Sequence, residues 1–215
     1  MNWTGETLPQ ILITPQAFQK LRLYIDLCPM EIGGLGEVER DDHRFLITDL
    51  FILPQKVSPS ETELDSAAVL EILECCVAEG RNPASLCLWW HSHAEMDVEW
   101  SETDERTIAN FSGDFMISLV GNKAGDFACR LDILPPNGRT LGDLPLTVVP
   151  RGGAEADETA LRTTIIAEMR EKLQVISREL QYHEIPVEVE FLSPFPPELC
   201  PPESPSSSTI DDRRP

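Results

Sequence analysis

A continuous apolar run, Leu-Cys-Leu-Trp-Trp at residues 86–90, places the strongest constraint on the fold. The run has the length of a strand, and it lacks the alternation of apolar and polar residues that marks a half-buried strand. Such runs are typical of central strands that are covered on both faces. The chain must therefore supply helices for both sides of a sheet, and we expect a mixed β-sheet flanked by helices.

Helix signals lie on either side of this run. Pro15 suits the first turn of an amphipathic helix at residues 15–28, and Thr14 suits its N-cap. A second helix is expected to start at Ser66 and to end at Gly80. The first of these helices has an apolar side that can pack on a sheet.

Strand signals fill the remainder of residues 9–135. Two β-rich runs that meet at Asp41-Asp42 predict a hairpin or meander, whereas residues 54–65 read as a loop. The fold class is therefore α/β or α+β. The other predicted strands are residues 11–14, 115–122 and 127–134.

The composition changes after residue 135. We divide the chain into a domain at residues 1–135, a loosely structured linker at 136–156 and a C-terminal extension at 157–192. The extension is expected to hold a helix at 157–183 and an edge strand at 187–191. A Pro/Ser-rich tail, expected to be disordered, covers residues 193–215.

The helix expected at residues 157–183 has a one-sided apolar stripe. Its spacing allows a short coiled coil, and thus a homodimer or the docking of a partner. So short a stripe also suits packing on the helix's own domain. Both interpretations remain open. The stripe consists of Leu161, Ile165, Met169, Leu173, Ile176 and Leu180.

The charge of the chain limits its partners. Among 215 residues, 37 are acidic and 17 are basic, which gives a formal net charge of −20. Because such an excess repels phosphate backbones, we expect no nucleic-acid partner, whereas a basic protein would be attracted. The acids also have the simpler effect of keeping a protein in solution.

Targeting and cysteine signals indicate a cytoplasmic protein. The first residues have neither a basic n-region nor an apolar h-region, and no apolar run approaches the roughly 20 residues of a membrane helix. We therefore expect no membrane association. The six cysteines include no CxxC pair, which favours reduced thiols that lie mostly in the core.

Two of the four histidines, His91 and His93, directly follow the apolar run. If the strand continues through residue 93, their side chains share one face. Paired imidazoles suit a transition metal, and catalytic zinc takes three protein ligands and a water. Asp104 is the candidate third ligand, at a point where a polar loop gives way to helical sequence. With Ser101, it also fits a capping box, and the two roles are compatible.

The spacing His91-x-His93-x7-Ser101-x2-Asp104 resembles the signature of the JAMM metallopeptidases, a family also called JAB or MPN-plus. The similarity extends over about residues 9–135, and short loops favour a compact, prokaryote-like member. The family also has a glutamate beside glycines in an early strand. Glu31 fits this role because it lies just before the glycine-rich stretch 33–36.

Two other acids compete with Glu31 for that role. Glu37 and Glu39 lie after the glycine-rich stretch, so their positions match the family less well. The glycines have an additional use, since they allow backbones to approach closely within a sheet. They do not form a phosphate loop, because no GxGxxG or GK[ST] pattern is present.

The resemblance implies a cytidine-deaminase-like JAB/MPN fold with one Zn²⁺ per chain, held by His91, His93 and Asp104. It implies that Glu31 acts as the general base and that Ser101 donates a hydrogen bond to the oxyanion. The expected reaction is hydrolysis of an isopeptide or peptide bond after the C-terminal glycine of a ubiquitin-like protein. That protein or its conjugate is the expected partner, in deconjugation or precursor maturation.

Two other functions fit the same sequence. The first is a non-catalytic scaffold of the same fold, which zinc content would distinguish from an enzyme. The second is a metallopeptidase that acts on a sulfur-carrier adduct or a phage structural protein. Trp100, beside Ser101, is a candidate for lining the substrate groove, whereas Trp89 and Trp90 have the positions of core residues.

Overall fold

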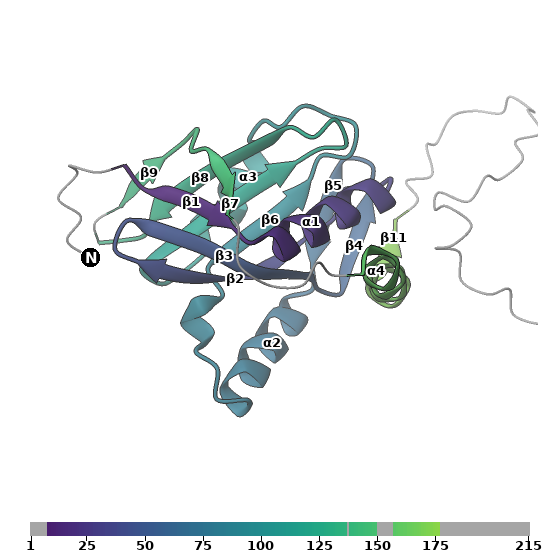
Figure 1. Cartoon of the computed structure of the whole chain (residues 1–215), viewed down its shortest axis with the longest axis horizontal. Coiled ribbons are helices and arrows are strands. Elements are labelled where there is room, and N and C mark those ends of the chain that lie inside the picture. The colour runs from purple at the N-terminus through teal and green to yellow at the C-terminus, as the bar shows by residue number, and fades with distance from the viewer. Residues whose placement is uncertain (1–7, 137, 150–156, 177–215) are drawn as a thin grey trace, which may run out of the picture.

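The computed structural model describes residues 8–136, 138–149 and 157–176 (Figure 1). Its main element is a sheet of eight strands. In spatial order these are β10 (Leu146–Val148), β1 (Gln10–Ile13), β3 (Arg44–Ile52), β2 (Gly33–Asp41), β6 (Leu88–Ser92), β7 (Phe115–Gly121), β8 (Phe127–Ile133) and β9 (Arg139–Leu141). The sheet is mixed, since β6 is parallel to β7 and antiparallel to β2. The expected fold class is confirmed.

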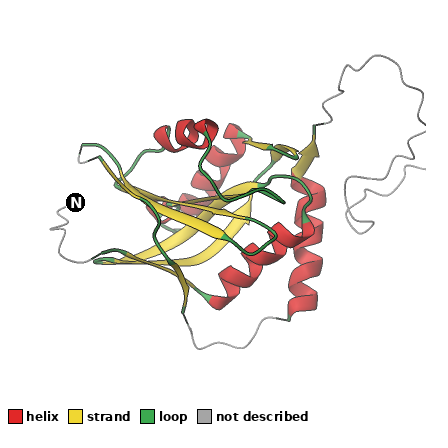
Figure 2. Cartoon of the chain, turned by 90° about the horizontal axis from the view of Figure 1, so that it is seen from above, coloured by secondary structure: helices red, strands yellow, loops and turns green. Residues whose placement is uncertain are grey.

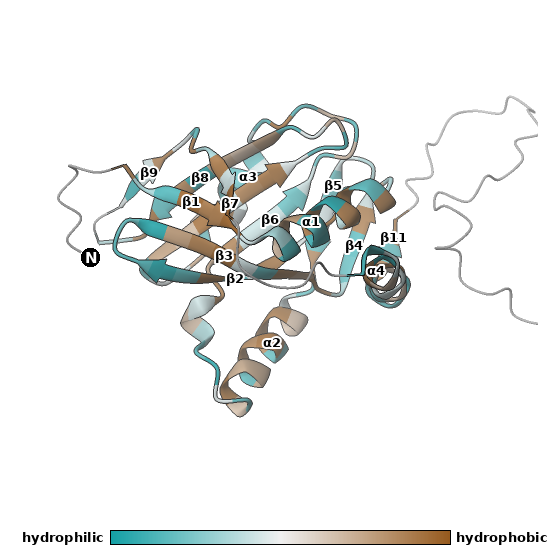
Figure 3. Ribbon diagram, viewed as in Figure 1, coloured by the Kyte–Doolittle hydropathy of each residue, from teal (hydrophilic) through white to brown (hydrophobic). Residues whose placement is uncertain are grey.

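Helices cover both faces of this sheet (Figure 2). One core includes buried residues of α1 (Pro15–Leu27) and α4 (Glu158–Lys172). A second, smaller core includes α2 (Ser66–Ala78) and α3 (Glu102–Ala109). A short 3₁₀ turn, η1 (Pro83–Ser85), precedes β6. Hydrophobic residues gather along the central strands between these helices (Figure 3).

Strand β6 is the central strand that the apolar run predicts. All five of its residues are buried, and its two tryptophans lie on opposite faces. Trp90 stacks on Tyr24 of α1 at a ring distance of 5.4 Å, whereas Trp89 belongs to the core of α2 and α3. Each face of β6 thus contributes one large aromatic side chain to a different core.

The two helix starts follow from their caps. The Thr14 side chain accepts a hydrogen bond of 3.2 Å from the Ala17 N–H, and Pro15 occupies the first helical position. At α2 the cap is Asp65, which accepts from the Ala67 N–H at 2.9 Å. Gly80 follows the helix with φ of +71°, a conformation that favours glycine.

The glycines of β2 allow close approach, as expected. A Cβ atom built on Gly34 would lie 1.9 Å from the carbonyl oxygen of Phe51 in β3. A Cβ on Gly33 would lie 2.9 Å from the carbonyl oxygen of Trp90 in β6. Strand β2 therefore fits between its two neighbours only because these side chains are absent.

The prediction of a loop at residues 54–65 was wrong. This segment forms a hairpin of β4 (Gln55–Ser58) and β5 (Glu61–Leu64), which belong to a three-stranded sheet of order β11-β4-β5. Val57 is fully buried and its neighbour Lys56 is exposed, which is the alternation of a strand. This alternation is short, and the surrounding Pro and Ser residues favoured the prediction of a loop.

The helix predicted at 157–183 is shorter than expected. Helix α4 ends at Lys172, and the chain continues as β11 (Leu173–Val175), which pairs in parallel with β4. Backbone pairing with β4 replaces the next helical turn. Ile165 and Met169 of the apolar stripe are buried in the chain's own core, which supports the interpretation of packing on its own domain.

The segment 136–156 also differs from the loose connector predicted for it. Strands β9 and β10 lie within it and extend the eight-stranded sheet at its two edges. The strand predicted at 187–191 and the tail at 193–215 lie outside the described residues. The five described cysteines are free, and all but Cys75 are buried. Within the described ranges, no helix has the length and apolar character to cross a membrane.

Candidate metal centre

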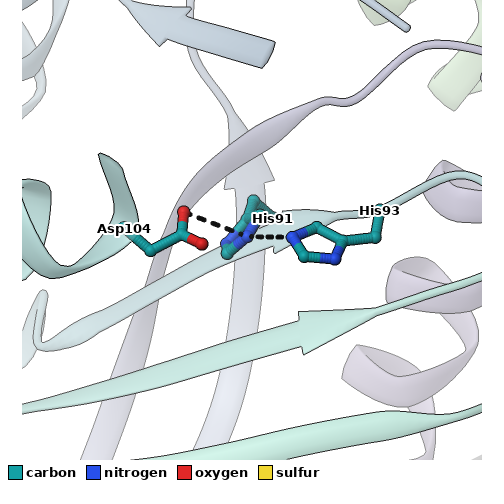
Figure 4. A group of neighbouring side chains, drawn as sticks. All are labelled: His91, His93 and Asp104. Atoms are coloured by element: carbon teal, nitrogen blue, oxygen red, sulfur yellow. Dashed lines mark hydrogen bonds and ion pairs between the residues drawn. The ribbon is translucent and has the colours of Figure 1, made fainter. Parts of the chain in front are cut away.

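The two histidines of the motif converge at the end of β6 (Figure 4). The strand ends at Ser92, but the backbone N–H of His93 donates to the Gly121 carbonyl at 2.9 Å and keeps the chain alongside β7. The side chains of His91 and His93 therefore lie on one side, with their Nε2 atoms 3.1 Å apart. They are 2% and 8% exposed, respectively.

Asp104 approaches the histidines from the first turn of α3. Its Oδ1 atom lies 3.3 Å from Nε2 of His91, and the ligand atoms of all three residues lie within 4.8 Å of one another. The capping box is present as well. The Ser101 N–H donates to Oδ2 of Asp104 at 2.8 Å, and the Asp104 N–H donates to Oγ of Ser101 at 3.1 Å. One carboxylate oxygen thus serves the cap and the other faces the imidazoles.

The side chains of His91, His93 and Asp104 are arranged to bind a cation rather than to satisfy one another by hydrogen bonds. Nδ1 of His93 lies 2.6 Å from the carbonyl oxygen of Asp97. Since a carbonyl only accepts, this Nδ1 donates, and Nε2 of neutral His93 keeps its lone pair. That lone pair and the Asp104 carboxylate both face Nε2 of His91. Nε2 of His93 and Oδ1 of Asp104 lie 3.1 and 3.3 Å from Nε2 of His91, so the three ligand atoms are grouped closely enough to hold one metal ion.

Burial keeps His91 in its metal-binding form. It lowers the pKa of His91 to about 4, against the opposing effect of the Asp104 charge and with a further lowering by His93. The neutral imidazole is the form that binds a metal. Nδ1 of His91 is buried and has no hydrogen-bond partner among the described residues.

Glu31 lies two residues before the first residue of β2 and lines the same cavity as the three candidate ligands. Its backbone N–H donates to the Ser58 carbonyl at 3.0 Å, which fixes it to the β4–β5 hairpin. Its residue exposure is 6%, and burial, followed by the charges of Asp104 and Glu61, raises its pKa to about 7.

The two competing glutamates lie elsewhere. Glu37 forms an ion pair with Arg81, and neither Glu37 nor Glu39 lines the cavity of the three ligands. The structure thus brings Glu31, rather than its competitors, to the candidate metal centre.

The cavity has a volume of about 700 Å³. Among the described residues that line it, five are acidic and none is Lys or Arg, so a divalent cation would offset part of a concentrated negative charge. The acidic residues are Glu31, Glu61, Asp97, Glu99 and Asp104.

Several parts of the site were missed by sequence reasoning. The Asp97 carbonyl that orients His93 has no side-chain signal. The Trp89 ring stacks on His91 at 4.6 Å, a contact that the i, i+2 spacing on a strand would have indicated. The hairpin contributes Ser60, Glu61 and Thr62 to the cavity, which the loop prediction concealed. Trp100 lines the cavity beside Ser101, in the position expected for it.

Comparison with known proteins leaves the family open. No protein-family model matches this chain, and no curated protein sequence is similar to it. A similar solved structure is the solution structure of protein DSY2949 from Desulfitobacterium hafniense. It is 18% identical, with a TM-score of 0.48, over 65% of this chain and 94% of that chain. A similarity this distant leaves the chemistry of the site to be argued from its own residues.

Proposed function

We propose that this chain is a zinc-dependent metallopeptidase that hydrolyses an isopeptide or peptide bond after the C-terminal glycine of a ubiquitin-like protein. The observation that carries the proposal is the convergence of a His-His-Asp ligand set with Glu31 and Ser101 in one cavity. These five residues come from the motif that resembles the JAMM family.

The ligand set favours zinc. Two imidazoles and one carboxylate are a set of three protein ligands of the kind that catalytic zinc sites use, in which a water would take the remaining position. When bound, zinc supplies a Lewis acid that polarises the scissile carbonyl and lowers the pKa of a coordinated water toward neutrality. The hydrogen bond from His93 to the Asp97 carbonyl holds one ligand in the required tautomer.

Glu31 has the properties of a general base. A base works best when its pKa lies near the working pH, and burial has raised the pKa of Glu31 to about 7. Its carboxylate takes a proton from the attacking water and then delivers it to the leaving amine. Its backbone is anchored to the hairpin by the hydrogen bond from its N–H to the Ser58 carbonyl, which fixes the side chain beside the candidate ligands.

Ser101 has a hydroxyl proton available for an oxyanion. Its Oγ atom accepts from the Asp104 N–H, which leaves the hydroxyl hydrogen available for donation to an oxyanion. Ser101 is exposed and lines the cavity. Loss of one oxyanion donor typically lowers kcat by about 10²- to 10³-fold.

A C-terminal peptide tail suits the open side of the cavity. Strand β5 pairs only with β4 in the small sheet as described, and its residues Glu61 and Thr62 line the cavity. An extended tail can add to such an edge as a further strand. The acidic lining favours a basic modifier or conjugate.

Zinc stoichiometry and turnover test the proposal together. We expect about one zinc per chain in the wild type by elemental analysis, and little in Asp104→Ala or His91→Ala. Glu31→Gln should keep its zinc and lose hydrolysis of reporters fused to Gly-Gly-ending modifiers. Zinc absent from the wild type after reconstitution, or full turnover by Glu31→Gln, would contradict the proposal.

A further inference from the structure

A buried arginine lies behind the segment that carries Ser101 and Asp104. Arg130 of β8 has a residue exposure of 7%, although a guanidinium is costly to bury without partners. It belongs to no part of the His-Ser-Asp motif. Its partners therefore indicate what its burial achieves.

One set of contacts fixes the guanidinium within the sheet. Nε and Nη2 of Arg130 donate to the two carboxylate oxygens of Asp132 at 2.8 and 2.9 Å, in a bidentate pair. Asp132 also accepts a hydrogen bond of 2.6 Å from the Thr140 hydroxyl in β9. A bidentate pair has little rotational freedom, so it also fixes the direction of Nη1 and of the planar face of the guanidinium.

The other contacts reach toward the metal centre. Nη1 of Arg130 forms an ion pair with Glu105 of α3 at 2.5 Å. Its guanidinium carbon lies 5.4 Å from the centroid of the Trp100 ring, within the range of a cation–π contact. Trp100 directly precedes Ser101, and Glu105 directly follows Asp104. Arg130 thus contacts both residues that flank the segment 101–104.

This segment needs support from outside. Helix α3 has eight residues, and helices this short have little stability of their own. Of its residues only Asp104 and Ile108 are buried. The contacts of Arg130 with Trp100 and Glu105 add two further anchors at the end of α3 that carries the ligand.

We propose that Arg130 is a positioning residue that sets the place of Asp104 and Ser101 relative to the two histidines. It acts through Trp100 and Glu105, and the inference rests on the proposed metal centre. Removal of a group that hydrogen-bonds directly to a metal ligand typically weakens metal binding by about 10- to 100-fold, and Arg130, which acts through the neighbours of Asp104, should lie near the lower end of that range. A lysine cannot replace this arginine fully, because it lacks both the bidentate fork and the planar face.

A purely structural ion pair would have a different signature. Loss of such a pair would lower the thermal stability and leave metal affinity unchanged in the protein that remains folded. A positioning role changes the metal centre itself. Co²⁺ distinguishes the two, because its visible absorption reports the geometry of its ligands, and no turnover is needed.

The experiment is a Co²⁺ titration of metal-free full-length protein, followed by competition with Zn²⁺. The variants are Arg130→Gln and Arg130→Lys. The matched control is Arg106→Gln, since Arg106 is an exposed arginine of the same helix, and its Nε atom donates to the Glu102 carbonyl at 3.1 Å. All proteins are compared well below their melting temperatures.

We expect Arg130→Gln to bind Co²⁺ about tenfold more weakly with an altered spectrum, Arg130→Lys to be intermediate, and Arg106→Gln to match the wild type. Wild-type affinity and spectrum in folded Arg130→Gln would overturn the inference. If that variant does not fold, Glu105→Ala decides, because it leaves the Arg130–Asp132 pair intact. It should weaken binding about two- to tenfold, and no change would overturn the inference. A wild type that binds no Co²⁺ or Zn²⁺ would instead overturn the proposed metal centre.

Discussion

The side-chain amide nitrogen of Asn122 donates a hydrogen bond of 3.0 Å to the backbone carbonyl oxygen of Met96. Asn122 follows β7 and is 3% exposed, and its amide oxygen accepts from the Asp126 N–H at 2.9 Å. The residue after Met96 is Asp97, whose carbonyl orients His93. One buried amide therefore connects the β7–β8 turn to the loop that orients His93, a candidate metal ligand.

Asn122→Ala should weaken both the fold and the metal centre. It leaves the Met96 carbonyl without this partner, so we expect a loss of about 1–3 kcal/mol in the free energy of unfolding. Zn²⁺ affinity should fall about tenfold, because His93 is held less firmly. Denaturant unfolding and competitive Zn²⁺ titration measure the two effects.

The control for this variant is the neighbouring Lys123→Ala. Lys123 forms an ion pair with Glu95, whose side chain is 79% exposed. Such surface pairs contribute at most about 1 kcal/mol, so this variant should keep its Zn²⁺ affinity. Equal Zn²⁺ affinities in Asn122→Ala and the wild type would show that the loop does not depend on Asn122.

Local patterns were sufficient for the ligand set but not for its surroundings. His91 and His93 share a face because strand geometry has a period of two, and the capping box at Ser101 is encoded within four residues. Local sequence carries both signals. The contact of Asn122 with Met96 joins residues 26 positions apart through a backbone oxygen, which no residue type in the sequence reports.

The same distinction explains the errors in the fold. The central strand, expected from the run at 86–90 and found at Leu88–Ser92, and the helix after Thr14 were predicted because their signals are strong and continuous. Strand β11 forms only because β4 offers it a partner more than a hundred residues earlier in the chain. Helical periodicity around Leu173 therefore predicted the wrong state, since tertiary pairing overrode local preference.

Glu31→Gln should stabilise the metal-free protein at neutral and alkaline pH. The pKa of Glu31 is raised from 4.5 to about 7, so the folded state binds this proton more tightly than the unfolded state. Stability therefore falls as the pH rises from about 4.5 to 7, and glutamine removes that loss. Above pH 7 we expect a gain on the order of 1–3 kcal/mol, below the full linkage value because the cavity admits solvent.

Urea unfolding at several pH values, with a chelator present, measures this gain. The difference between Glu31→Gln and the wild type should disappear below about pH 4.5, where both side chains are neutral. Glu99→Gln, at an exposed position of the same cavity, is the matched control and should show a smaller effect. A variant no more stable than the wild type at pH 8 would mean that Glu31 is not held in an unfavourable environment.

Gly34→Ala should disrupt the pairing of β2 with β3. The new Cβ would meet the Phe51 carbonyl oxygen at 1.9 Å, and backbone atoms cannot yield as a flexible side chain would. We expect destabilisation by more than about 3 kcal/mol or failure to fold.

At Gly142 no atom lies within 4 Å of the added Cβ, so Gly142→Ala should stay within about 0.5 kcal/mol of the wild type in the same unfolding measurement. Comparable stability of the two variants would refute the close approach of the strands.

Metal removal should separate the two roles of Asp104. Asp104→Asn keeps an oxygen for the Ser101 N–H but loses the charge that faces His91, whereas Ser101→Ala loses the cap and keeps all three ligands.

Zn²⁺ at 100 times its Kd should stabilise the wild type by about 2.7 kcal/mol, so a chelator should lower its melting temperature by several degrees. Ser101→Ala should start about 1 kcal/mol less stable and show the same response to the chelator. Asp104→Asn should show almost none. A chelator response in Asp104→Asn as large as in the wild type would mean that Asp104 serves only the helix cap, and that the third ligand lies elsewhere.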